Sequence, residues 1–233
     1  PERVYSAQPG FFTIGLNTKD APTDNPLVRK ALAAATDRRA LLDNVFNTPW
    51  RQTATGIIPP EIPGYQGDAV GFAYNPTLAQ TLLADAGYPG GVGLPTVHLY
   101  GYPSNQAQLD AIADQWRAVL GITVETHYRT DFGSWMSNEC MNDLAACDSS
   151  GVRVGWIVDY YDAYNVIGDW FNYATSRTGW DSIRYRELMD LIRAEQDPAQ
   201  RIAYIQEAEQ ILVEDDAAVI PLYFNDRVSL VKP

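Results

Sequence analysis

The sequence predicts an α/β fold, with α+β as the alternative, built around one sheet. Segments rich in β-branched and aromatic residues alternate with amphipathic helical segments along the 233 residues. Between residues 96 and 128, a predicted strand, a long helix and a second strand follow one another, as in a crossover between parallel strands. Because no repeat or low-complexity segment interrupts this pattern, we expect a single domain.

The individual elements follow from local periodicity and from helix caps. Asn25, Asp37, Asn75 and Asp197 are typical N-cap residues, and three of the four directly precede a proline. The elements predicted in chain order are a strand at Phe11–Leu16, helices at Leu27–Ala35 and Arg38–Phe46, a proline-rich turn at Ile57–Gly64, a helix that starts at Pro76 and stops at Gly87, a glycine-rich turn at Gly90–Gly93, a strand at Thr96–Tyr100, a helix at Asn105–Leu120, a strand at Ile122–Tyr128, a short helix at Asp131–Met136, a strand at Val152–Val158, helices at Ala163–Phe171, Ser182–Ala194 and Asp197–Glu214, and strands at Val219–Phe224 and Val228–Val231.

The strand at Val152–Val158 reads as a buried, central strand that ends in an acidic and aromatic segment. Two carboxylates, Asp159 and Asp162, bracket two tyrosines directly after it. In open α/β sheets, ligands bind just beyond the carboxyl ends of the strands, so this segment is a candidate site. The alternative is that Asp159 only begins a loop or caps the following helix, since aspartate is common in both places.

Charge and hydropathy exclude some classes of protein. Seventeen basic against 29 acidic residues give a formal charge of −12, the wrong sign for neutralising phosphates, so we expect no nucleic-acid partner. No apolar run approaches the roughly 20 residues that span a bilayer. The 14 tyrosines and 6 tryptophans suit both a core and a recognition surface.

Few residues suggest processing, metal or redox chemistry. Pro1 is not an initiator residue, so we expect a mature or excised piece of a protein. Cys140 and Cys147 would close a small loop worth about 2.5 kcal/mol in an oxidising compartment, with free thiols as the alternative. His98 and His127 fall on separate predicted strands without a third soft ligand at suitable spacing, so we expect neither a metal site nor a cofactor.

Several segments, in this order, resemble the extracytoplasmic solute-binding proteins of family 5, which serve peptide and nickel ABC importers. The resemblance covers nearly the whole chain and is closest to the carboxyl-terminal lobe of those proteins. The matching motifs are Leu16–Thr18, Val28–Leu32 with Thr36–Arg38, Ile58–Pro60, Tyr74–Ala79 with Leu82–Tyr88, the strand residues Arg153, Gly155, Trp156, Asp159 and Tyr160, and finally Asp197–Glu209 with Ile220–Tyr223.

This resemblance implies one lobe, spanning residues 1–233, of a type II periplasmic-binding-protein-like receptor, with a mixed central sheet flanked by helices. The second lobe would be missing, and the chain would be excised from a larger two-lobed receptor. Such a receptor is extracytoplasmic, is not an enzyme, and closes on an oligopeptide or another small solute for delivery to an ABC permease in the membrane.

The resemblance also implies candidate ligand-binding residues. Asp159 matches the aspartate that pairs with a peptide's amino terminus, a contact worth roughly 4 kcal/mol at 4 Å in a shielded site and about 1 in open water. Arg153 resembles a basic position that meets carboxylates or the peptide backbone, with a structural ion pair as the alternative. Strand alternation puts Trp156 and Tyr160 on one face. The candidate aromatic walls are Trp156, Tyr160, Tyr161, Tyr223, Phe224, Phe132 and Trp135.

Two other functions stay open at this point. A glycosidase would use paired carboxylates such as Asp159 and Asp162, although no catalytic motif accompanies them. A nickel or other metal receptor would rely on His98 and His127.

Overall fold

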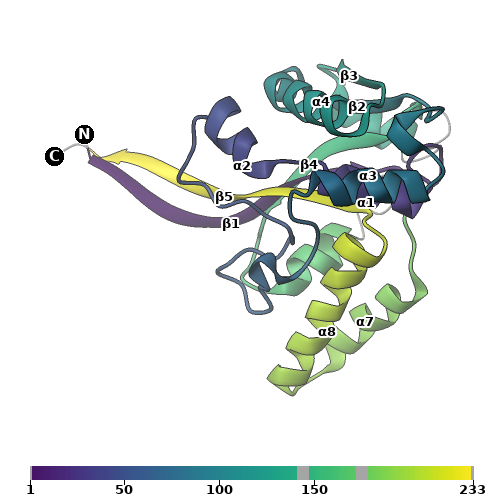
Figure 1. Ribbon diagram of the computed structural model, residues 1–233. Coiled ribbons are helices and arrows are strands. Elements are labelled where there is room, and N and C mark those ends of the chain that lie inside the picture. Colours follow the sequence, from purple (N-terminus) through teal and green to yellow (C-terminus); the bar gives the residue numbers. More distant parts are fainter. Residues whose placement is uncertain (1, 141–146, 172–177, 232–233) are drawn as a thin grey trace.

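The computed structural model describes residues 2–140, 147–171 and 178–231 (Figure 1). A five-stranded sheet has the strand order β3–β2–β4–β1–β5. Strands β2, β3 and β4 are parallel, and β1 is antiparallel to both of its neighbours. The prediction of an α/β fold around one mixed sheet is therefore confirmed. The strands are β1 (Glu2–Leu16), β2 (Val97–Gly101), β3 (Val124–Tyr128), β4 (Gly151–Ile157) and β5 (Val219–Val231).

Strand β4 is the middle strand of the sheet, as its composition predicts. It pairs in parallel with β2, where Leu99 faces Gly151, and in antiparallel with β1, where Gly10 faces Ile157. The expectation of a buried strand is confirmed for its first two residues only. The next four residues are half-buried, and Ile157 at its end is exposed.

Strands β1 and β5 are longer than predicted and leave the body as a two-stranded ribbon (Figure 1). Outside the body, the pairing runs from Ala7 opposite Asp226 to Glu2 opposite Val231. The two strands predicted at the carboxyl end are one continuous strand. Asn225 and Asp226 have turn-like composition, but their backbone extends the pairing between two distant parts of the chain.

The helices agree with the predicted order, and several of them end in a π-helical turn. None of the described helices is both long enough and apolar enough to cross a membrane. The helices are α1 (Pro26–Ala34), α2 (Arg38–Ala40) continued by η1 (Leu41–Val45), η2 (Gly67–Ala69), α3 (Pro76–Asp85), η3 (Pro89–Gly91), η4 (Pro103–Asn105), α4 (Gln106–Leu120), α5 (Phe132–Trp135) continued by η5 (Met136–Cys140), η7 (Asn165–Trp170), α7 (Ile183–Ala194) and α8 (Pro198–Gln210) continued by η8 (Ile211–Asp215).

All four N-caps read from the sequence form in the structure. The side chains of Asn25 and Asn75 accept hydrogen bonds from backbone amides of the first turns of α1 and α3. Asp37 and Asp197 do the same for α2 and α8. Each cap satisfies an amide that the helix itself leaves without a partner, which fixes where the helix begins.

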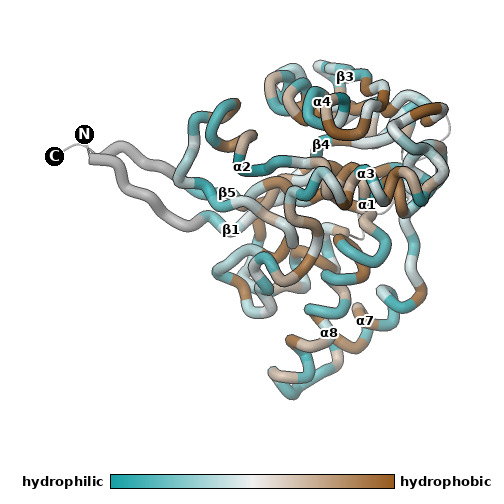
Figure 2. The backbone as a smooth tube through the Cα atoms, viewed as in Figure 1, coloured by the Kyte–Doolittle hydropathy of each residue, from teal (hydrophilic) through white to brown (hydrophobic). Residues whose placement is uncertain are grey.

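Two hydrophobic clusters fill the two faces of the sheet. Ile14 and Leu16 of β1 face the cluster under α1, α3 and α4, where Trp116 is fully buried. Phe11 faces the opposite cluster, which Leu188 and Leu212 join from α7 and η8. Figure 2 shows hydrophobic and hydrophilic residues alternating along α7 and α8, as expected for helices that bury one face.

A disulfide joins Cys140 to Cys147, with 5.3 Å between their Cα atoms. The residues between them lie outside the described part of the chain. Both cysteines are buried in a small cluster with Phe132, Trp135 and Val152. The bond thus closes a short loop beside β4.

The buried carboxylate of Glu209 holds the proline-rich segment against α8. Its Oε1 accepts hydrogen bonds from the amides of Ile57 (2.7 Å) and Ile58 (2.9 Å), and its Oε2 accepts one from Gln66 (3.0 Å). The side chain is 1% exposed, and burial raises the pKa of Glu209 although these hydrogen bonds oppose the change. Only glycine fits at position 56, because a Cβ there would lie 2.5 Å from Oε1.

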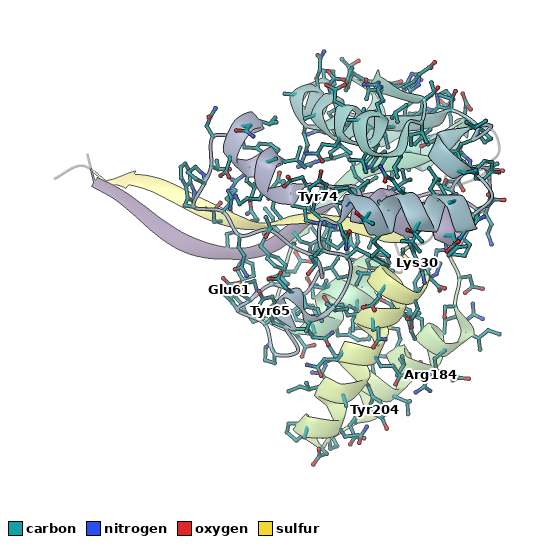
Figure 3. The ribbon with its side chains drawn as sticks, in the orientation of Figure 1. Lys30, Glu61, Tyr65, Tyr74, Arg184 and Tyr204 are labelled. Carbon is teal, nitrogen blue, oxygen red and sulfur yellow. A yellow bond between two sulfur atoms is a disulfide. The ribbon has the colours of Figure 1, made fainter. Side chains whose placement is uncertain are left out.

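We predict that Glu209→Ala lowers the free energy of unfolding by about 2–4 kcal/mol, because two buried amides lose their acceptor. Glu207→Ala is the matched control on the same helix. Glu207 pairs with Arg184, which lies on α7 (Figure 3), but the side chains are 42% and 46% exposed, so its loss should cost at most about 1 kcal/mol. Urea denaturation measures both values, and equal effects would contradict the anchoring role of Glu209.

Candidate ligand-binding site

The segments that follow three parallel strands converge on one groove. Tyr102 comes directly after β2, Phe132 follows β3, and Trp156 lies near the end of β4. The groove has a volume of about 340 Å³ and lies where the carboxyl-end rule for α/β sheets locates ligands. Its lining residues are Phe12, Tyr102, Phe132, Gly133, Ser137, Arg153, Val154, Gly155, Trp156 and Trp170.

Arg153 is the charged group of this groove. Its Nε donates a hydrogen bond to Oε1 of Gln108 (2.9 Å), and its Nη2 donates to the hydroxyl of Tyr223 (3.1 Å). Burial lowers the pKa of Arg153, but a guanidinium stays charged at neutral pH. No carboxylate among the described residues forms an ion pair with it, so the structural ion pair considered as the alternative is absent there. The groove therefore contains a cation that neutral side chains hold in place.

The ring of Phe12 lies over this guanidinium and depends on a glycine in the next strand. The Cζ atom of Arg153 lies 4.0 Å from the centroid of the Phe12 ring. Gly155 pairs with Phe12 across β1 and β4, and a Cβ at Gly155 would lie 2.2 Å from the ring. Gly155 is thus needed because its missing side chain lets the Phe12 ring lie close to the backbone of β4. Its backbone angles do not require glycine.

Asn165 fixes the end of β4 and the start of the acidic segment. Its Oδ1 accepts hydrogen bonds from Nε1 of Trp156 and from the amide of Asp159, both at 3.0 Å. The carboxylate of Asp159 is exposed and has no hydrogen-bond or ion-pair partner among the described side chains. This acidic group is available to an incoming ligand, but it does not line the groove itself.

The other predicted aromatic walls do not line this groove. Tyr160 and Tyr161 are exposed. Partial desolvation of the Tyr160 hydroxyl and its hydrogen bond to Asp169 raise the pKa of Tyr160 to about 12. Because β4 ends at Ile157, the predicted alternation of side chains does not extend to these tyrosines. Their contact with a ligand stays a prediction.

Tyr223, Phe224 and Trp135 are buried around the groove. Tyr223 is 3% exposed and lies behind Arg153, whose guanidinium it contacts. Phe224 belongs to the cluster under α7 and α8, and Trp135 stacks on Tyr100. Phe132 is also largely buried, although part of it lines the groove.

Asp162 has a structural partner, Arg201 of α8. Its Oδ1 accepts hydrogen bonds from Nη2 of Arg201 on α8 (2.9 Å) and from the amide of Tyr164 (2.8 Å). Burial opposes ionisation of this carboxyl, but the two hydrogen bonds outweigh it and lower the pKa of Asp162. A glycosidase acid needs a raised pKa, whereas the pKa of Asp162 is lowered, so Asp162 does not have the electrostatics of that acid.

Two arginines of the matching motifs support the fold. Arg29 donates hydrogen bonds to backbone carbonyls of Thr23, Asp24 and Asp216. Arg38 donates to carbonyls of three separate segments, including that of Pro221 in β5, and burial lowers the pKa of Arg38 to about 10. These guanidiniums join loops and helices to the sheet and lie away from the groove.

Sequence reasoning missed three aromatic residues that line the groove, namely Phe12, Tyr102 and Trp170. A signal for Tyr102 existed, because it follows a predicted strand of the parallel pair just as Asp159 follows β4. Phe12 gave no local signal, since its place depends on which strands pair with β1. Trp170 lies in the helix after β4, where its spacing fits a core residue equally well.

The mixed sheet with a groove at the ends of its parallel strands is the fold and site expected for the family that the motifs indicate. The model of the bacterial extracellular solute-binding proteins, family 5 (Middle), matches residues 2–177, and the chain belongs to this family. The family expected from the motifs is thereby confirmed.

Comparisons with individual proteins agree with this family assignment. The chain is 27% identical over 226 residues to the oligopeptide-binding protein OppA of Bacillus subtilis, covering 92% of this chain and 40% of that protein. It superposes on a periplasmic oligopeptide-binding protein from Borrelia burgdorferi with a TM-score of 0.83 and 26% identity, covering 97% of this chain and 44% of the other. DppA from Helicobacter pylori, solved in complex with the peptide STSA, gives a TM-score of 0.82 at 22% identity over 97% and 44% of the two chains, a likeness of fold alone. The chain thus spans less than half the length of these proteins.

We predict that Asp162→Asn lowers the free energy of unfolding by about 1 kcal/mol at pH 7, through loss of the ion pair with Arg201. Since the folded-state pKa of Asp162 lies below its ordinary value of 3.8, this contribution is complete above that value and is lost as the pH falls through the folded pKa. Urea denaturation at pH 7 and at pH 3 tests this.

The matched control is Asp114→Asn, which removes an exposed pair with Arg117 and should have almost no effect at either pH. A difference between Asp162→Asn and the original protein that grows towards acidic pH would contradict the assignment.

Proposed function

We propose that the chain is one lobe of a two-lobed receptor that binds peptide-like solutes for an ABC importer. The observation that carries the proposal is the groove at the ends of β2, β3 and β4, which combines aromatic walls with the unpaired guanidinium of Arg153. An extended peptide offers side chains to the rings and carbonyl or carboxylate oxygens to the cation.

The second lobe would be joined through the ribbon of β1 and β5. These strands leave the body together (Figure 1), and they leave from the same edge at which the parallel strands end. A lobe attached there faces the groove. The lengths of the relatives, of which this chain covers 40–44%, support this arrangement.

The two ends of a peptide would be recognised by opposite charges. Arg153 attracts a carboxylate or backbone carbonyls, and Asp159 attracts the ammonium group of the amino terminus. In open solvent, the Asp159 contact is worth only about 1 kcal/mol at 4 Å, against roughly 4 once the site is shielded. Closure of the second lobe over the groove supplies this shielding.

The expected partners and location follow from this role. A membrane permease receives the solute, and the receptor works outside the cytoplasm, where the disulfide between Cys140 and Cys147 is stable. The relatives described above are named as peptide-binding proteins and not as enzymes, and the ion pair with Arg201 does not favour a protonated Asp162. The net charge of −12 argues against nucleic acid.

We predict that Asp159→Asn in the two-lobed receptor weakens binding of a library-selected tetrapeptide about 10- to 100-fold, through loss of the contact with its ammonium group. N-acetylation of the peptide should weaken binding to the original receptor by a similar factor. Because both changes remove the same contact, combining them should cost little more than either alone. Isothermal titration calorimetry measures all four affinities.

The matched control is Asp85→Asn, which changes an exposed carboxylate of α3 and should leave the affinity unchanged. Fully additive effects of Asp159→Asn and N-acetylation would show that the aspartate does not meet the amino terminus.

We also predict that the separate lobe binds the same peptide only at millimolar strength. If the receptor binds at micromolar strength, about −8 kcal/mol, and the lobes share the contacts equally, one lobe retains about −4 kcal/mol. Titration followed by amide chemical shifts measures such weak binding. Micromolar binding by residues 1–233 alone would argue against a shared cleft.

A further inference from the structure

The chain contains two histidines, and the fold brings both of them to one place. His98 lies on β2 and His127 on β3, and the two strands pair in parallel. The Nδ1 atom of His98 lies 3.0 Å from the Nε2 atom of His127. Neither ring lines the groove. The proposed solute-binding role therefore leaves this pair unexplained.

The register of the two strands adds a carboxylate. Glu125 is the direct partner of His98 across the strands and lies two residues before His127, so all three side chains project from the same face. Its Oε2 atom lies 3.7 Å from Nδ1 of His98 and 3.8 Å from Nε2 of His127. Two imidazole nitrogens and one carboxylate oxygen, all common metal ligands, thus form a compact triangle.

The size of this triangle fits a small transition-metal ion. A tetrahedral Zn²⁺ with bonds of about 2.0–2.1 Å separates its ligand atoms by about 3.3–3.4 Å. The three measured separations, 3.0, 3.7 and 3.8 Å, lie on both sides of that value. Shifts of a few tenths of an ångström in side chains complete the geometry.

The three side chains are accessible to a metal ion, and negatively charged residues lie beside them. His98 is 20% exposed, His127 33% and Glu125 57%, so an ion can reach all three side chains. An open cavity of about 420 Å³ lies beside His98, and Asp20 and Asp148 help to line it. Among the described residues, these carboxylates make the approach negative.

Neighbouring side chains lie where they suit ligation by the two rings. The other ring nitrogen of His98, Nε2, faces the carboxylate of Asp148 at 3.9 Å. Metal-bound histidines commonly direct their second N–H at a carboxylate, which fixes the tautomer with a free lone pair at the metal. Tyr100 stacks on His127, with 4.4 Å between ring centroids and 16° between planes. The guanidinium of Arg129 is held by Asp131 and adds no free cation here.

From this geometry we propose that His98, Glu125 and His127 form a binding site for Zn²⁺ or a similar divalent transition-metal ion, with one coordination position open to water. Two imidazoles and one carboxylate are a donor set that zinc accepts readily. The bound ion cross-links β2 to β3 at the edge of the sheet. The site is separate from the groove, so it is independent of the proposed solute.

Zinc chloride is the probe for the test, and the imidazole signals are the first readout. Because the protein has two histidines, its nitrogen-detected imidazole spectrum contains two rings and no others. One equivalent of Zn²⁺ is expected to shift both rings together, and a chelator is expected to restore them. Saturation at one equivalent distinguishes the site from scattered weak binding by surface carboxylates.

Calorimetry with variants gives the second readout. His98→Gln and His127→Gln are each expected to weaken zinc binding at least about tenfold, and Glu125→Gln less. The matched control is Glu61→Gln, which changes an exposed carboxylate far from β3 (Figure 3) and should have no effect. Because Glu125 is more than half exposed, Glu125→Gln should fold normally even if a histidine variant does not.

Either of two results would overturn the proposal. One is a spectrum in which the imidazole signals stay unchanged at several equivalents of Zn²⁺. The other is an affinity for Zn²⁺ that survives in the double variant His98→Gln, His127→Gln.

Discussion

The pairing of β4 with two neighbours of opposite direction is the constraint on which the groove depends. Parallel pairing with β2 brings the carboxyl ends of the parallel strands to one edge. Antiparallel pairing with β1 then sets Phe12 opposite Gly155, where the missing side chain lets the ring lie across the strand and over Arg153. The pairing of β4 with β2 and β1 thus determines where the groove lies. It also places the Phe12 ring as one wall of the groove and as the contact that holds the Arg153 guanidinium.

Two buried arginines and the partly buried Arg153 show how the same side chain serves the fold and the site. Arg29 and Arg38 donate to backbone carbonyls that would otherwise lack partners, so their burial stabilises loops at the edge of the sheet. Arg153 donates to an amide oxygen and a tyrosine hydroxyl, both neutral side-chain groups. Partial burial of a charge without a counter-charge carries a desolvation cost, and an anionic or carbonyl-bearing ligand would offset this cost. The contrast supports a binding role for Arg153.

Local chemistry made much of the fold predictable, and long-range pairing accounts for what was missed. A few neighbouring residues are enough to predict the caps at Asn25 and Asp197 and the central strand after Gly151. The register that brings Glu125 beside His98 was not, because it depends on packing between strands that a helix separates. The ribbon was missed for a similar reason, since Asn225 and Asp226 resemble a turn until a partner strand is present. Tyr223 matched a family motif, but the sequence did not tell whether it faces the groove or the core.

Arg153 and Asp159 differ in burial, and this difference implies an order of events in the proposed receptor. Arg153 is already fixed by Phe12, Gln108 and Tyr223, so it can engage a ligand in the open lobe without further ordering. The Asp159 carboxylate is exposed, and an ion pair in water is weak. A peptide would therefore dock first on the aromatic and cationic groove, and its ammonium contact would strengthen only as the second lobe excludes water. In the proposed receptor, binding energy that appears on closure would favour the closed form over the open one, and this difference would let a permease recognise a loaded receptor.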